Sequence, residues 1–209
     1  MSFKIVPLFH TPLYANKINI SDTEKQNLIN QDYKDIITRN GKISKTKFIL
    51  NEEKFHGLRD KLNKHVDIYT RDALTVRRDI TFVLQNSWCM RHDPGHWAQK
   101  HYHENCVLSG IIYIKTSPTS GNLCFHHRPA QNNLFSPIFK IPFEKANIHN
   151  SSIYCFQPED GTIVIFPSFL DHSANINKSD GVRYCLSFNY TIKGVLGVGT
   201  EMVWPLGKV

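Results

Sequence analysis

Histidines are concentrated in one stretch of the chain, because six of the eleven lie between His92 and His127. Two of them, His101 and His103, stand immediately before the apolar segment CVLSGIIYIK. If residues 101–103 are already extended, alternate side chains point to the same face, and both imidazoles could bind one metal ion. A histidine beside a strand is more often a surface or hydrogen-bonded residue, so the H-x-H pattern alone is weak support for a metal site.

A third imidazole comes from His172, which follows the segment GTIVIFPSFLD. Pro167 ends the predicted strand in this segment and returns the chain toward the sheet. Imidazole nitrogen suits iron, zinc, copper and nickel alike, so three histidines predict a metal site without identifying the metal. His126 and His127 end another predicted strand and could reach the same place, although a surface role is favoured for both.

An arginine follows the third histidine at the start of the strand-like segment RYCLSFNY. Period-two alternation directs Arg183 to the same face as Cys185 and Ser187. A buried guanidinium that lacks an anion costs roughly 3 to 5 kcal/mol, so an inward Arg183 requires a carboxylate partner, which its fork would bind through two hydrogen bonds. The alternative is an internal salt bridge, for which the candidate partners are Asp171, Asp180 and Glu159.

The elements that position these residues change character near residue 80. Before it, Ser21 to Glu24 has the spacing of a capping box. A helix that ends at Gly41 is predicted by apolar residues that recur on one helical face, namely Leu28, Ile29, Tyr33, Ile36 and Ile37. A second helix is predicted after Asn51, with its apolar face made by Phe55, Leu58, Leu62, Val66 and Tyr69.

Short apolar runs bounded by Gly, Pro, Asn and Ser follow, and they predict strands. These runs are DITFVLQNSWCM, CVLSGIIYIK, GNLCFHH, SIYCF, GTIVIFP and RYCLSFNYTI. Strands that follow helices, without alternating with them, favour an antiparallel sandwich or barrel. The segment 129–150, rich in Asn, Pro and Phe, is long for a hairpin loop and is predicted to be a lid or substrate loop.

The bulk properties predict one soluble domain. A length of 209 residues suits a single core, no apolar run reaches the roughly 20 residues of a membrane helix, and the N-terminus lacks the pattern of a signal peptide. We therefore expect a cytoplasmic protein. Five widely spaced cysteines without a C-x-x-C pair indicate neither a disulfide framework nor a zinc finger, and are expected to be buried apolar side chains. A net charge of +7 attracts anions but matches no nucleic-acid signature.

Three of these segments together resemble a known family. HYHENCVLSGIIYIK resembles the H-x-H-x-N-(three residues)-S-G-(two residues)-Y block of iron(II)/2-oxoglutarate-dependent oxygenases, most closely those of bacteria and bacteriophages, and more distantly the H-x-D block of prolyl hydroxylases. GTIVIFPSFLDHSANIN is similar to the block with the distal histidine, and RYCLSFNY to the last core strand. The opening IVPLFHTPLY is similar to the N-terminal strand of this subgroup. The resemblance covers most of residues 80–192.

The resemblance implies a double-stranded β-helix, a jelly-roll or cupin-like barrel, buttressed by the two helices. In this arrangement residues 1–209 form a single domain. Residues 1–79 supply an N-terminal strand and the supporting helices, 80–192 the barrel, and 193–209 a C-terminal extension.

The resemblance also implies roles for single residues. His101 and His172 would bind iron(II), Arg183 would pair with the far carboxylate of 2-oxoglutarate, and Tyr113 and Ser187 would add hydrogen bonds to this co-substrate. The sequence departs from the family at residue 103, where His103 replaces the usual Asp and gives three neutral ligands. Other candidate carboxylates are worse placed than His103, since Glu104 would point to the opposite face, and Asp93 and Asp171 are more remote.

The implied function is a dioxygenase that uses iron(II) and 2-oxoglutarate with dioxygen, and hydroxylates an unidentified small-molecule or peptide substrate with release of succinate and carbon dioxide. One alternative is a cupin-type metalloenzyme that does not use 2-oxoglutarate and gives Arg183 no special task. Another is a catalytically silent barrel that binds metal or 2-oxoglutarate, which the absence of a carboxylate at His103 makes credible. A non-enzymatic basic protein is a weaker third.

Overall fold

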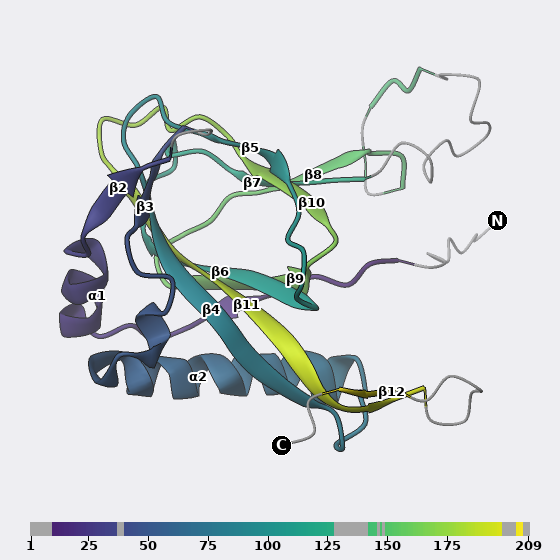
Figure 1. Cartoon of the computed structure of the whole chain (residues 1–209). Coiled ribbons are helices and arrows are strands. Elements are labelled where there is room, and N and C mark those ends of the chain that lie inside the picture. The colour runs from purple at the N-terminus through teal and green to yellow at the C-terminus, as the bar shows by residue number, and fades with distance from the viewer. Residues whose placement is uncertain are drawn as a thin grey trace.

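Two antiparallel sheets face each other in the computed structural model, and the helices cover the outer face of the larger sheet (Figure 1). The structure describes residues 10–36, 40–127, 142–145, 147 and 149–197, and the backbone of 204–206. Within these residues, no helix is both long enough and apolar enough to cross a membrane.

The larger sheet has the strand order β1-β9-β6-β11-β4-β3-β2, with β12 paired to β11. Its strands are β1 (Tyr14–Lys17), β2 (Tyr33–Asp35), β3 (Lys42–Ser44), β4 (Thr81–His92), β6 (Leu108–Lys115), β9 (Thr162–Pro167), β11 (Arg183–Leu196) and β12 (Trp204–Leu206). The smaller sheet has the order β5-β10-β7-β8, made by β5 (Ala98–His101), β7 (Leu123–His126), β8 (Ile153–Phe156) and β10 (Asp171–Ala174). From β4 onward the chain passes repeatedly between the two sheets, which is the predicted jelly roll.

Strand β11 contributes side chains to two apolar clusters, one on each face of the larger sheet. Its residues Leu186 and Phe188 belong to the apolar cluster that contains the helices, whereas Cys185 belongs to the cluster between the sheets. The predicted alternation is therefore confirmed, and both faces of the strand are buried. Arg183 and Ser187 share the inward parity of Cys185, so these two polar residues face the interior of the barrel.

The second predicted helix is confirmed as α2 (His56–Asp67), which is preceded by the short 3₁₀ turns η1 (Ile49–Asn51) and η2 (Glu53–Phe55) and continues into the π-helical turn η3 (Ile68–Ala73). The five apolar residues predicted to form one face, Phe55, Leu58, Leu62, Val66 and Tyr69, are all buried against the sheet. This face anchors the helix to the outside of the barrel.

The first helix is shorter than predicted. The helix α1 (Asp22–Ile29) begins with the expected capping box, in which the Ser21 hydroxyl accepts from the amide of Glu24 while the Glu24 carboxylate accepts from the amide of Ser21. The prediction that the helix continues to Gly41 is wrong, because the chain turns after Asn30 and then forms β2, which pairs with β3. Tyr33 therefore packs as a strand residue, and a spacing that suited a helix came from two different elements.

The prediction for the cysteines is wrong in part. Cys124 and Cys155 form a disulfide, and they stand directly opposite each other on the paired strands β7 and β8. Cys89 and Cys185 are buried thiols, as predicted. The sequence did not reveal this pair because 31 residues separate its members, and only the strand register brings them together.

The predicted lid, residues 129–150, lies mostly outside the described residues.

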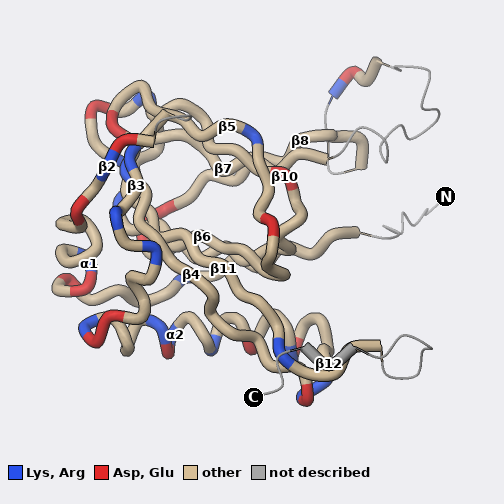
Figure 2. Tube along the Cα trace, viewed as in Figure 1, with Lys and Arg blue, Asp and Glu red and all other residues tan. Residues whose placement is uncertain are grey.

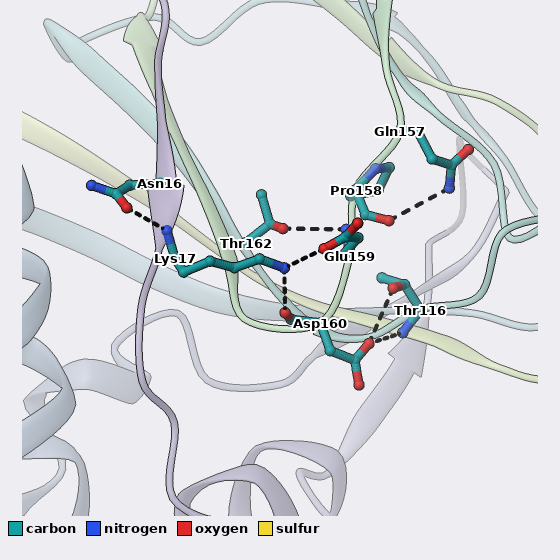
Figure 3. A network of polar contacts seen from close by, with 8 residues as sticks. All are labelled: Asn16, Lys17, Thr116, Gln157, Pro158, Glu159, Asp160 and Thr162. Atoms are coloured by element: carbon teal, nitrogen blue, oxygen red, sulfur yellow. Dashed lines mark hydrogen bonds and ion pairs between the residues drawn. The ribbon is translucent and has the colours of Figure 1, made fainter.

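A polar network fastens the edge strand β1 to the turn before β9 (Figure 3). The Lys17 ammonium donates to the Glu159 carboxylate at 2.8 Å and to the backbone carbonyl of Asp160 at 3.0 Å. The Asp160 carboxylate accepts from the amide and the hydroxyl of Thr116, at the end of β6. Charged residues lie mainly on the helices and outer connections, and β7 and β9 carry none (Figure 2).

Candidate active site

Three of the predicted histidines meet at the open end of the barrel. Each offers a ring nitrogen, and the nitrogens of His101, His103 and His172 all lie within 4.8 Å of one another. His101 ends β5 and His172 lies on β10, where the strand register places the two residues opposite each other. His103 follows β5 in the connection to β6, so two short strands and one turn bring the three side chains together.

The Nδ1 atom of each histidine is engaged by an oxygen atom. His101 contacts the backbone carbonyl of Gln99 at 2.8 Å and His172 that of Leu170 at 3.0 Å. A carbonyl oxygen only accepts, so Nδ1 carries the proton in both rings, and the lone pair belongs to Nε2. His103 Nδ1 contacts the side-chain oxygen of Asn189 at 2.7 Å and the Ser109 hydroxyl at 2.9 Å. Such contacts fix the tautomer and the ring orientation of histidines that bind a metal.

A cavity of about 580 Å³ joins the three histidines to the interior of the larger sheet. This volume is within the range of small-molecule sites. Among the described residues, the lining includes two cations, Lys47 and Arg183, and no Asp or Glu. Burial, together with the charge of Lys34, lowers the pKa of Lys47 to about 8. The cavity is therefore suited to an anionic ligand.

Among the described residues, Arg183 is the largest fully buried side chain, with 2% of its surface exposed. Its Nη1 donates to the backbone carbonyls of Ser120 at 2.6 Å and Gly121 at 3.1 Å, whereas its Nη2 is buried and has no hydrogen-bond partner in the described part of the chain. None of the described carboxylates forms an ion pair with it, which excludes the internal salt bridges to Asp171, Asp180 and Glu159. An unpaired buried donor is costly, so the site fits a ligand that brings a carboxylate.

Glycine is required next to this arginine. Gly121 has φ +93°, and a Cβ there would collide with the Asn175 carbonyl and lie 2.8 Å from Arg183 Nη1. The close approach of the Gly121 backbone lets its carbonyl accept from the guanidinium, which holds Arg183 in position.

The other predicted cofactor residues line the same cavity. Tyr113 on β6 and Ser187 on β11 are both buried, and both face the interior with Arg183. Burial raises the pKa of the Tyr113 phenol, with a smaller effect from Cys185, so its hydroxyl stays protonated. Burial also raises the pKa of the Cys185 thiol to about 11, which makes Cys185 a neutral wall residue.

Other residues considered from the sequence lie apart from the three histidines. Among the described residues, only His101, His103 and His172 form a group with metal-ligand geometry. His126 contacts the Ser173 hydroxyl through Nε2 at 2.7 Å, and His127 is exposed. Asp93 pairs with Arg91, and Glu104 accepts from the Tyr102 hydroxyl. Trp88 is among the residues that line the cavity, whereas Trp97 and Asn105 are not.

Sequence reasoning missed two residues of this site, His92 and Asn189. His92 ends β4 and is the register partner of Arg183, and Asn189 lies on β11 and contacts His103. Both have the inward parity of residues that line the cavity, since Asn189 follows Ser187 by two and His92 follows Trp88 by four. Extending that alternation along each strand would have found them.

The family described as "Putative 2OG-Fe(II) oxygenase" matches residues 86–189, which contain the three histidines and Arg183. Among curated protein sequences, none matches the chain.

Solved structures with the same fold come from several 2OG-Fe(II) oxygenases. An oxidoreductase of the 2OG-Fe(II) oxygenase family from Burkholderia pseudomallei has a TM-score of 0.58 at 10% identity, with 86% of this chain and 84% of that chain covered. HygX from Streptomyces hygroscopicus, with nickel, 2-oxoglutarate and hygromycin B bound, has a TM-score of 0.57 at 13% identity, with 87% and 83% covered. A Pseudomonas putida prolyl-4-hydroxylase has a TM-score of 0.57 at 11% identity, with 88% and 94% covered. The chain belongs to the 2OG-Fe(II) oxygenases, a family of oxidoreductases.

Proposed function

We propose that His101, His103 and His172 hold iron(II), and that Arg183, Tyr113 and Ser187 bind 2-oxoglutarate, so that the chain hydroxylates a small-molecule or peptide substrate. The observation that carries this proposal is that one cavity contains three oriented imidazoles and a buried Arg183 whose Nη2 has no partner among the residues that the structure describes. Imidazole nitrogens suit iron(II), and a guanidinium suits a carboxylate.

Each residue of the chain has a limited task in this reaction. The three histidines present Nε2 atoms whose directions are set by their Nδ1 contacts. Arg183 holds the far carboxylate of 2-oxoglutarate, and the protonated Tyr113 and Ser187 hydroxyls donate to the same co-substrate. When bound, iron and 2-oxoglutarate supply the oxidising chemistry: dioxygen gives one oxygen atom to the substrate as hydroxyl and the other to succinate, and carbon dioxide leaves.

Two alternatives have different chemical consequences. A cupin-type enzyme without 2-oxoglutarate gives Arg183 no anion, although its Nη2 is buried and unpaired. A catalytically silent barrel is favoured by one observation, the neutral His103 in place of a carboxylate. This replacement gives the metal site one more positive charge than a site with two histidines and a carboxylate. Turnover separates this second alternative from the oxygenase.

The experiment is to incubate the iron(II)-loaded protein with 2-oxoglutarate in air and to measure succinate. Wild-type protein should form succinate even without its substrate, as uncoupled turnover, and His172→Ala should form none. His56→Gln is the matched control, because His56 is exposed at the start of α2. Bound iron and 2-oxoglutarate without succinate would favour the silent barrel.

We further propose that the protein works in the cytoplasm, where 2-oxoglutarate and iron(II) are available. The disulfide between Cys124 and Cys155 is the feature that argues for an oxidising compartment instead. Mass spectrometry of the protein alkylated in freshly lysed cells tests this proposal. Two alkylated cysteines at positions 124 and 155 support the cytoplasm, and an intact disulfide in every molecule opposes it.

A further inference from the structure

His92 is a buried histidine whose ring nitrogens form no hydrogen bond with any described group of the protein. Only 3% of its surface is exposed, and both of its ring nitrogens are buried without a hydrogen-bond partner. A neutral imidazole has one N–H donor and one acceptor, and leaving them unpaired in the interior is costly. A buried polar group without a partner requires an explanation, and the helices and strands around His92 offer none.

The position of His92 in the sheet supplies the explanation. His92 ends β4 opposite Arg183, which begins β11, so the two side chains emerge side by side on the inner face. Both residues line the cavity that contains the three histidines. Arg183 Nη2 also lacks a partner, so three unpaired buried nitrogens lie at the same end of one cavity.

The surroundings of His92 exclude a metal ligand or a charged base. Among the described residues, it belongs to no group with metal-ligand geometry. Burial, followed by the charges of Arg183 and His96, lowers the pKa of His92 to about 3, so the ring is neutral at physiological pH. Gly41 covers one edge of the ring, since a Cβ there would lie 3.1 Å from Cδ2 and Nε2. A neutral, fixed imidazole beside a guanidinium presents a second hydrogen-bond donor.

The His92 ring and Arg183 Nη2 are two neighbouring hydrogen-bond donors, which suit a ligand group that only accepts hydrogen bonds. A carboxylate has two oxygens and about four lone-pair directions, so it could accept from Arg183 Nη2 and from the His92 ring together. We infer that His92 is a second binding residue for the far carboxylate of 2-oxoglutarate, a role that rests on the proposed function. His92 thereby favours 2-oxo acids with a second carboxylate over those with an apolar end.

The experiment compares two ligands that differ only at this end. The anaerobic iron(II) protein is titrated with 2-oxoglutarate and with 2-oxopentanoate, which has a methyl group in place of the far carboxylate. His92→Leu should weaken 2-oxoglutarate about tenfold, the effect of one hydrogen bond to a charged group, and leave 2-oxopentanoate within about twofold. His92→Gln retains a donor and should recover part of the loss.

A second measurement compares the two ligands on the wild-type chain, and this comparison does not depend on how well the variants fold. In the zinc-substituted, ¹⁵N-histidine-labelled protein, 2-oxoglutarate should produce a new solvent-protected ring N–H signal, which 2-oxopentanoate does not produce and which is absent in His92→Gln. Equal weakening of both ligands in His92→Leu would overturn the inference, and so would an unchanged affinity for 2-oxoglutarate. A wild-type protein that binds no 2-oxoglutarate would overturn the proposed function as well. If Arg183→Ala weakens the binding of 2-oxoglutarate and His92→Leu does not, only the role of His92 is overturned.

Discussion

His103 and Asn189 are 86 residues apart, yet the imidazole Nδ1 of His103 lies 2.7 Å from the side-chain oxygen of Asn189. Asn189 is itself held from two sides, because the Ser109 hydroxyl donates to its oxygen and its amide donates to Asn86. This contact links the turn after β5 to the last core strand, β11. The one histidine of the three that lies outside a strand is therefore oriented by a side chain from the larger sheet.

Removal of Asn189 should weaken metal binding without removing a ligand. We expect Asn189→Leu to lower the affinity for iron(II) by about 10- to 100-fold, the usual effect of losing a partner that orients a metal-bound histidine. Asn189→Asp retains an acceptor for His103 and should stay close to wild type. Competition with a metal-binding dye measures both affinities, and equal affinity in Asn189→Leu would show that His103 needs no support.

The pair His101 and His103 should differ from the pair His126 and His127 in its effect on iron binding. His101→Ala should reduce the affinity for iron(II) by more than about 100-fold, because the loss of a ligand exceeds the loss of a supporting partner. His126→Ala should leave that affinity unchanged, since His126 contacts Ser173 and lies outside the metal-ligand group. Metal content after dialysis provides the measurement, and a loss of iron in His126→Ala would make His126 a fourth ligand.

Arg183 should control the affinity for 2-oxoglutarate through its shape as well as its charge. Arg183→Ala should cost about 2 to 5 kcal/mol of binding free energy, the range for truncating a buried charged partner. Arg183→Lys retains the charge but lacks the fork, so its KM for 2-oxoglutarate should lie between the other two. Succinate formation at varied 2-oxoglutarate gives these values, and an unchanged KM in Arg183→Ala is incompatible with the assigned role.

The stability of the ligand-free protein should fall in mild acid because of His92. Burial holds the pKa of His92 at about 3, below the unfolded value of about 6.5, so the unfolded chain binds the extra proton first. The contribution of His92 to stability is fully present above pH 6.5 and is lost as the pH falls toward 3. Between pH 6.5 and pH 5 the loss should be on the order of 2 kcal/mol.

Urea unfolding at several pH values tests this dependence. His92→Gln has no titrating group at this position and should show a smaller loss over the same range. Lowered pKa values of His65 and His126 act in the same direction, so a residual slope is expected in the variant. If the free energy of unfolding depends on pH identically in wild type and in His92→Gln, the pKa of His92 does not change on folding.

Sequence patterns predicted the barrel strands as short apolar runs, and β6, β9 and the first half of β11 are buried on both faces. The six predicted runs correspond to β4, β6, β7, β8, β9 and β11. The short strands β5 and β10 were not predicted as strands, although they carry His101 and His172, because their sequences, AQKH and DHSA, are mostly polar and contain no apolar run. The same limitation concealed β2, whose Tyr33 had the spacing of a helix.

Features that depend on strand register were beyond the sequence. The alternation along β11 predicted an inward Arg183, but only the pairing of β11 with β4 places His92 beside it. Likewise, the pairing of β7 with β8 is what joins Cys124 to Cys155. The division of the chain at residues 79 and 192 stays a prediction.

The central claim is that the three histidines and Arg183 form one site for iron(II) and 2-oxoglutarate. Its most direct test is anaerobic addition of both to the protein, with visible absorption recorded for the charge-transfer band of the chelated complex. The account predicts a band in wild type that weakens in Arg183→Ala at limiting 2-oxoglutarate and vanishes in His172→Ala. Bound iron without such a band in the wild-type protein would contradict the account and favour a cupin-type metalloenzyme that does not use 2-oxoglutarate.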